Sequence, residues 1–141
     1  MSNDQGPMKK PDSDAYNLEE RTARFGEAVI KFCLGLPATP ITSPLITQFV
    51  KASTSLGANY GEADEAESKA DFRHKIAICR KESKESQHWC RMLAKACTTE
   101  AKPLRELWKE AHELHLIFCK IIRTTDANLR RERAAKKSST R

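Results

Sequence analysis

A heptad-like seam of apolar and small residues runs through the middle of the chain and constrains its fold more than any other feature. Its members recur at alternating steps of four and three residues, the spacing of one helix face that packs against other helices. They are Phe72, Ile76, Cys79, Ser83, Ser86, Cys90, Leu93 and Cys97. The middle of the seam, Ser83 and Ser86, is small and polar. The spacing therefore predicts a long helix that approaches its neighbours closely.

Two amphipathic segments precede this seam. The first is expected to begin at Asn17, which forms a capping box with Glu20, and to end at Pro37. The second is expected to begin with Ser43 as N-cap and Pro44 at the first helical position. Each segment carries one apolar stripe, so both are predicted to pack into a common core.

Two glycines, Gly57 and Gly61, lie inside the second predicted helix. Each costs about 1 kcal/mol relative to alanine in a helix interior. We expect the close approach of a neighbouring backbone to compensate for this cost.

The seam helix is expected to start with a capping box at Ser68 and Asp71, and a fourth helix to run from Lys102 or Pro103 to Leu129. The fourth stripe contains Leu104, Leu107, Ala111, Leu114, Phe118 and Ile121, widened by Trp108, His115 and Ile122. No segment shows the two-residue alternation of a strand. The sequence thus predicts an all-α fold, an antiparallel up-down-up-down four-helix bundle. It divides into a disordered tail over 1–16, the bundle over 17–129 and a basic tail over 130–141 that extends the last helix before fraying at Ser138.

Charge is concentrated at the C-terminal end. The chain has a net charge of +6, and residues 120–141 hold eight basic and two acidic side chains, which accounts for all of it. No stretch approaches the roughly 18 apolar residues of a membrane span, and the polar N-terminus lacks the pattern of a secretion signal. We therefore expect a cytoplasmic protein without membrane contact. The five cysteines follow no metal or redox spacing and are expected to pack in the core.

Three segments, in order and in spacing, resemble one family. They run from Ser53 to Glu62, from Asp71 to Lys75 and from Lys81 to Trp89. They are similar to the bacterial four-helix-bundle proteins encoded in intervening sequences of large-subunit ribosomal RNA genes, to which the accessory variability determinant of diversity-generating retroelements is related. One departure is Ala63, where the family usually has glycine after the glutamate, so the turn that follows is expected to differ.

This resemblance implies a four-helix bundle that assembles into a ring-shaped homopentamer. It also implies binding of nucleic acid or of a reverse-transcriptase complex for the retroelement branch, whereas the function of most members is unknown.

The basic C-terminal region is the first candidate site. Lysine and arginine at this density neutralise phosphates and release counterions, which gives salt-sensitive binding of RNA or DNA without sequence preference. The alternative is a solubilising tail, and no aromatic residue of the tail is present to stack on bases. The candidate nucleic-acid-binding residues are Lys120, Arg123, Arg130, Arg131, Arg133, Lys136 and Lys137.

The second candidate is an outer face of the seam helix, which we interpret as a subunit interface because it is partly apolar and carries a tryptophan. Its residues are Ile78, Glu82, Glu85, Trp89 and Met92. Alternatively, Trp89 closes the end of the monomer core and both glutamates are solvated.

The third candidate is a polar motif of the second helix, expected to hydrogen-bond across helices and to specify their register. It consists of Ser53, Ser55, Asn59 and Glu62. Catalysis or ligand binding by this group is the alternative interpretation.

The fourth candidate, His112, His115 and Cys119, shares one helix flank. A metal site generally needs four ligands, or three and a water, and the sequence supplies no matching cluster. We therefore expect no metal, no cofactor and no catalytic residue.

Together these patterns predict a non-enzymatic bundle that self-assembles and binds nucleic acid or a nucleoprotein complex through its basic surface and tail. The alternative is a scaffolding oligomer that docks a protein partner without nucleic acid. A metal or redox enzyme of the bundle core is the third interpretation.

Overall fold

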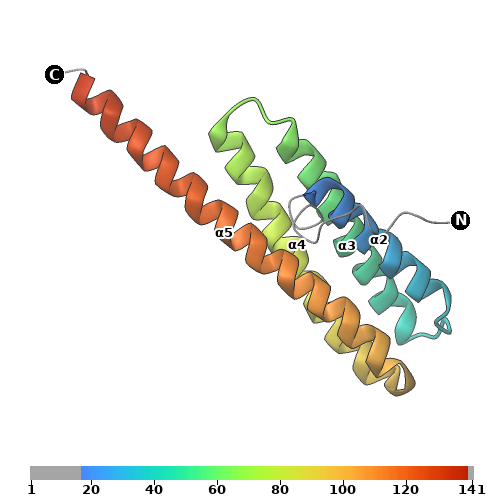
Figure 1. Ribbon diagram of the computed structural model, residues 1–141. Helices are drawn as coiled ribbons and strands as arrows, with labels where there is room; N and C mark the ends of the chain where they lie inside the picture. The colour runs from blue at the N-terminus through green and yellow to red at the C-terminus, as the bar shows by residue number, and fades with distance from the viewer. Residues whose placement is uncertain (1–16, 140–141) are drawn as a thin grey trace, which may run out of the picture.

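The computed structural model describes residues 17–139, and within them four α-helices form an antiparallel bundle (Figure 1). The elements are α2 (Leu18–Leu34), α3 (Thr42–Asp64), α4 (Lys69–Ala96), the short 3-10 helix η2 (Thr98–Glu100) and α5 (Ala101–Ser139). Successive helices run in opposite directions, so the predicted all-α up-down-up-down bundle is confirmed. The tail predicted over 1–16 and the last two residues, 140 and 141, lie outside the described residues.

The first helix begins where its capping signal predicts. The Asn17 side chain accepts a hydrogen bond of 3.2 Å from the backbone N–H of Glu20. The Glu20 carboxylate pairs with Arg24 one turn later, at 2.9 Å. The helix ends at Leu34 with Gly35 as C-cap, so the prediction that Pro37 ends it was three residues too long.

The predicted N-cap of the next helix, Ser43, was wrong. The helix α3 already begins at Thr42, and the Thr39 hydroxyl accepts the backbone N–H of Thr42 at 3.0 Å. The Thr42 hydroxyl in turn accepts the N–H of Thr39 at 2.9 Å. Because two threonines cap each other, Ser43 lies inside the first turn. Pro44 also fits there, since the first N–H groups of a helix have no partner within it.

The seam of α4 forms the centre of the core. The Ser68 hydroxyl accepts the N–H of Asp71 at 3.0 Å and starts the helix as predicted. Six seam residues are buried, whereas Phe72 and Cys97 at its ends are half-buried. The buried members are Ile76, Cys79, Ser83, Ser86, Cys90 and Leu93. Large apolar side chains from the other helices complete the cluster, among them Val29, Phe49, Leu56, Leu114 and Phe118.

The two glycines of α3 differ in their surroundings. A Cβ atom at Gly57 would lie 3.5 Å from the backbone of Thr22 in α2, so the close approach predicted there is present. A Cβ atom at Gly61 would meet nothing within 4 Å, so the same prediction was wrong for Gly61. The helix continues past it through the buried Ala63 to Asp64.

The last helix is the longest element. It begins one residue before the predicted start, and it continues through residues 130–139 without a break, so the basic segment is helical. Figure 1 shows its C-terminal end projecting past the loop between α3 and α4. None of the described helices combines the length and the apolar character that crossing a bilayer requires.

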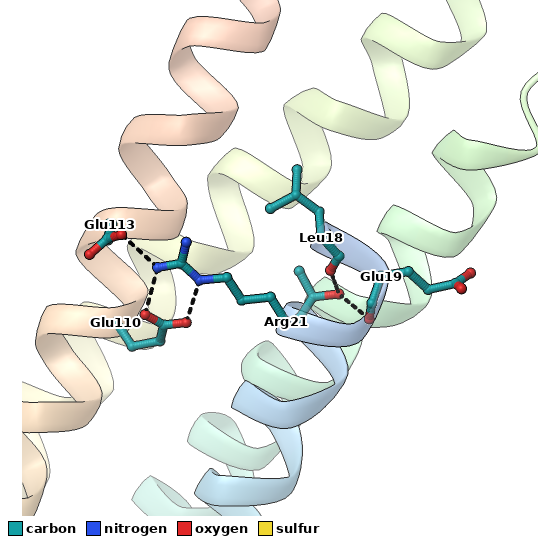
Figure 2. A network of polar contacts seen from close by, with 6 residues as sticks. Leu18, Glu19, Arg21, Glu110 and Glu113 are labelled. Atoms are coloured by element: carbon teal, nitrogen blue, oxygen red, sulfur yellow. Dashed lines mark hydrogen bonds and ion pairs between the residues drawn. The ribbon is translucent and has the colours of Figure 1, made fainter. Parts of the chain in front are cut away.

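An ion-pair cluster ties α2 to α5, although α2 packs mainly on α3. Figure 2 shows Arg21 reaching Glu110 through two nitrogen–oxygen contacts of 2.8 Å and Glu113 through one of 2.8 Å. The hydrogen bond to Glu110 raises the pKa of Arg21, although burial of the guanidinium opposes the shift. Arg21 and Glu110 are half-buried and Glu113 is exposed, and their ion pairs link α2 directly to α5.

Candidate nucleic-acid interface

The predicted basic residues all lie on α5, and their side chains are exposed. Lys120 and Arg123 lie alongside the bundle. The other five follow Leu129 on the continuing helix; they are Arg130, Arg131, Arg133, Lys136 and Lys137. We call residues 130–139 the α5 extension. Because the extension is helical, these cations are held at fixed spacing rather than along a loose chain.

Both acidic residues of this region pair with α4. Asp126 accepts two hydrogen bonds from the Arg73 guanidinium, at 2.9 and 3.2 Å, and Glu132 pairs with Lys69. These contacts join the start of α4 to the second half of α5. Both carboxylates of the basic C-terminal region are thus paired with cations of α4.

Asp126 has several arginines as neighbours. The hydrogen bond from Arg73 is the main reason that the pKa of Asp126 lies below its usual value, and partial desolvation opposes it. The positive charges of Arg130 and Arg80 lower this pKa further. One carboxylate therefore lies among three guanidinium groups from two helices.

Arginines of α4 contribute to this surface, and our interpretation of the sequence overlooked them. Helical repeat places Arg73, Arg80 and Arg91 on one side of α4, because they are separated by seven and eleven residues. Seven and eighteen residues likewise separate Arg130, Arg123 and Arg105 along α5. We call these six arginines together with Lys109 the α4–α5 basic face. The regular spacing was visible in the sequence, but relating the two rows requires the alignment of α4 with α5.

A row of polar contacts joins the two helices beneath this face. The Nδ1 atom of His112 lies 3.3 Å from Nε2 of Gln87. The Nδ1 atom of His115 lies 3.1 Å from the carbonyl oxygen of Arg80, and its Nε2 atom lies 3.5 Å from Sγ of Cys119. Since a carbonyl only accepts, Nδ1 of His115 carries the proton and Nε2 is free to accept the thiol of Cys119. The contacts of His112 with Gln87 and of His115 with Arg80 cross between α5 and α4, whereas that of His115 with Cys119 lies within α5.

The histidine–cysteine flank has no metal-binding geometry. Across residues 17–139, no three histidine, cysteine or acidic side chains come together as a metal site would require.

The polar motif of α3 bonds mainly within its own helix. The Ser53 hydroxyl donates to the carbonyl of Val50 at 3.2 Å, and the Asn59 amide donates to that of Ser55 at 2.9 Å. Among the described residues, only Glu62 of this motif bonds across helices, to Lys75 of α4 at 2.6 Å. The expected network across helices thus reduces to one ion pair at the end of the hairpin, because Ser53 and Asn59 form their hydrogen bonds within α3.

The outer face of α4 is half-buried along its whole length. It consists of Ile78, Glu82, Glu85, Trp89 and Met92. Trp89 packs against the core cluster, and its indole N–H is buried without a hydrogen-bond partner among residues 17–139. Such a donor normally finds a partner when it is buried.

The fold and this surface define a four-helix bundle with a basic face that extends along one long helix. The chain belongs to the 23S rRNA-intervening sequence protein family, whose sequence model matches residues 16–125. No curated protein matches the chain significantly.

A solved structure supports the fold. A protein of unknown function from the S23 ribosomal protein family of Bacteroides thetaiotaomicron VPI-5482, determined at 1.70 Å, is 23% identical to this chain. Its TM-score is 0.65, and the match covers 74% of this chain and 97% of that one. At this identity the likeness concerns the arrangement of the helices alone.

Proposed function

We propose that this protein is a non-enzymatic RNA- or DNA-binding bundle that uses the α4–α5 basic face and the α5 extension. The main support for this proposal is the environment of Asp126. This carboxylate is paired with Arg73 and lies near Arg80 and Arg130 as well, so arginines from two helices outnumber the acid between them. Glu132, the acid of the extension, is engaged by Lys69. A polyanion is the partner that such a surface fits.

The physical basis is the release of counterions from the phosphate backbone. A plot of log affinity against log salt has a negative slope for duplex DNA. Each phosphate that a lysine or arginine neutralises makes this slope steeper by about 0.9. The α4–α5 basic face contributes seven cations by its definition, and the extension adds four beyond Arg130, so several phosphates are within its capacity. Contacts of this kind fix position on the backbone and carry no base sequence. We further propose that the protein acts in the cytoplasm and that its nucleic-acid partner is part of a nucleoprotein or reverse-transcriptase complex.

Matched charge variants test this proposal. We compare R130Q/R133Q with K31Q/K51Q, which removes the same charge from exposed positions of α2 and α3. Affinity for a duplex, measured by fluorescence anisotropy at constant salt, should fall at least tenfold for R130Q/R133Q and change little for K31Q/K51Q. Equal losses would reduce the effect to net charge and would contradict a dedicated face.

Truncation after Thr125 is expected to abolish binding, but it also removes Asp126 and Glu132, which hold α5 to α4. The substitutions are therefore the cleaner test. If wild-type protein binds neither RNA nor DNA, the proposal fails, and the scaffolding oligomer that docks a protein partner takes its place.

Self-assembly is the second part of the proposal. The outer face of α4 is half-buried and partly apolar, and the buried indole N–H of Trp89 lacks a partner among the described residues. We propose that further copies of the chain cover this face and form a homopentamer. Several α5 extensions in one particle would then bind one nucleic acid with avidity.

Light scattering tests the assembly. We expect a mass near five times the 15.9 kDa of the chain. Ile78→Glu should reduce this mass, because it places a charge in the half-buried face, whereas Lys81→Glu on the exposed side of α4 should not. A monomer at all concentrations would contradict the proposal.

A further inference from the structure

A hollow of about 460 Å³ opens between α4 and α5 at the end of the bundle remote from the α5 extension. Its floor is apolar and includes Cys90, Ala94 and Leu104. Three cations border it; they are Arg91, Arg105 and Lys109. None of the lining residues is acidic. The hollow thus combines an apolar interior with a positive rim.

Trp108 forms the wall of this hollow. Its sequence position predicted a place at the edge of the core stripe, but the side chain is 38% exposed. Its ring stacks on the imidazole of His112, with centroids 5.0 Å apart and planes at 19°. Gln87 contacts that imidazole and restricts its rotation. An indole supported in this way is a rigid surface for a second flat ring.

A second hollow of about 440 Å³ adjoins the first, and both are lined by Trp108 and Arg91. It adds Lys84, together with the acid Glu85. Trp108 and Arg91 therefore contribute to both depressions.

Two of the bordering arginines have no partner of their own. Within residues 17–139, neither Arg91 nor Arg105 forms a hydrogen bond or an ion pair, whereas Lys109 lies 3.7 Å from Glu106. Guanidinium groups without a carboxylate are suited to bind phosphate through two parallel hydrogen bonds. The positive charge at the rim favours an anionic ligand, and the indole of Trp108 favours a ligand with a flat aromatic ring.

We propose that this hollow is a stacking site for one unpaired base of a nucleic-acid strand, with the flanking phosphates at Arg91 and Arg105. The inference rests on the nucleic-acid binding proposed above and adds a preference for unpaired nucleotides. A base inside a duplex is stacked on its neighbours and cannot reach Trp108, whereas an exposed base stacks on aromatic side chains regardless of its identity. The site lies on the same α4–α5 basic face that leads to the extension.

The test uses the emission of Trp108 in full-length Trp89→Phe protein, where it is the remaining tryptophan of the chain. A single-stranded oligoadenylate should quench this emission in a saturable way, and a blunt RNA duplex should not. Free adenosine monophosphate, which has the same base and phosphate, should compete only at much higher concentration, because it lacks the neighbouring phosphates. Competition by the mononucleotide at equal concentration would overturn the assignment to a strand.

Two variants measure the contribution of the site. Trp108→Ala should weaken binding of the single strand by about 5- to 150-fold, the usual effect of losing one stacked base, and leave duplex binding unchanged. R91Q/R105Q preserves the apolar packing and should lower the single-strand salt slope by about 1.4, because each lost phosphate contact removes about 0.7. The second variant keeps the test valid if the first does not fold.

The outcomes separate the two proposals. If both variants bind single strand and duplex as the wild type does, the stacking site is wrong, and Arg91 and Arg105 take no part in duplex binding either. Binding by the α5 extension and the other arginines of the face then stands. If the wild type binds no nucleic acid, both fail. If Trp108→Ala changes the particle mass in light scattering and leaves affinity unchanged, the occupant is a second copy of the chain, and the base-stacking assignment is overturned.

Discussion

At the scale of single residues, burial decides what the cysteines can do. Cys33, Cys79 and Cys90 are buried in the core, whereas Cys97 and Cys119 are half-buried. Burial raises the pKa of Cys79 and Cys90 to about 12 and that of Cys33 to about 11, because a thiolate loses its hydration there. The three core thiols therefore act as small apolar groups, as their sequence register predicted.

This difference predicts a selective reaction with iodoacetamide. At pH 8 the native protein should be alkylated at Cys97 and Cys119, and the three buried thiols should react only after unfolding, as mass spectrometry of peptides would show. Since burial raises the folded pKa, the stabilising effect of the neutral thiols is complete below about pH 8.5 and is lost as the pH rises toward 12. Equal labelling of all five cysteines in native protein would contradict the burial.

At the scale of elements, the crossing of α2 and α3 depends on small residues from both helices. A Cβ atom at Gly26 would lie 3.4 Å from the carbonyl oxygen of Ser53, and one at Gly57 would lie 3.5 Å from the backbone of Thr22. Contact at 3.5 Å is an ordinary van der Waals distance, so a methyl group fits at Gly57 and a longer side chain does not.

We therefore expect Gly57→Ala and Gly61→Ala each to stabilise the protein by up to about 1 kcal/mol through helix propensity. Gly57→Leu should instead destabilise it by about 1 to 3 kcal/mol, because the side chain must displace α2. Urea unfolding measures these effects. Gly61→Leu is the matched control, since its site is open, and equal stability of the two leucine variants would refute the close crossing.

Local patterns predicted the helices well, because a helix is determined by neighbours three and four residues away. The caps at Asn17 and Ser68 are local in the same sense. The cap at Thr39 spans the same three residues, to Thr42, but it was missed because the Ser43–Pro44 pair offered a competing start signal. The exposure of Trp108 was also missed, because periodicity gives the direction of a stripe but not how much of its edge the neighbouring helices cover.

At the scale of the whole molecule, the positive charges of the α4–α5 basic face lie along one side of the bundle. Only the end of this distribution was apparent as a basic C-terminal segment. The larger part needs the alignment of α4 with α5, which brings Arg73, Arg80 and Arg130 around Asp126. A face of this length predicts that binding depends on the number of phosphates reached rather than on their sequence.

The salt dependence of duplex binding measures how many phosphates the protein contacts. Affinity measured over a series of salt concentrations should give a steep linear plot of log affinity against log salt for the wild type. The slope for R130Q/R133Q should be shallower by up to about 1.8, since two phosphate contacts are lost, and that for K31Q/K51Q should be unchanged. A wild-type affinity that does not vary with salt would contradict binding through the α4–α5 basic face and the α5 extension together. An equal slope in all three proteins would contradict phosphate contacts by Arg130 and Arg133.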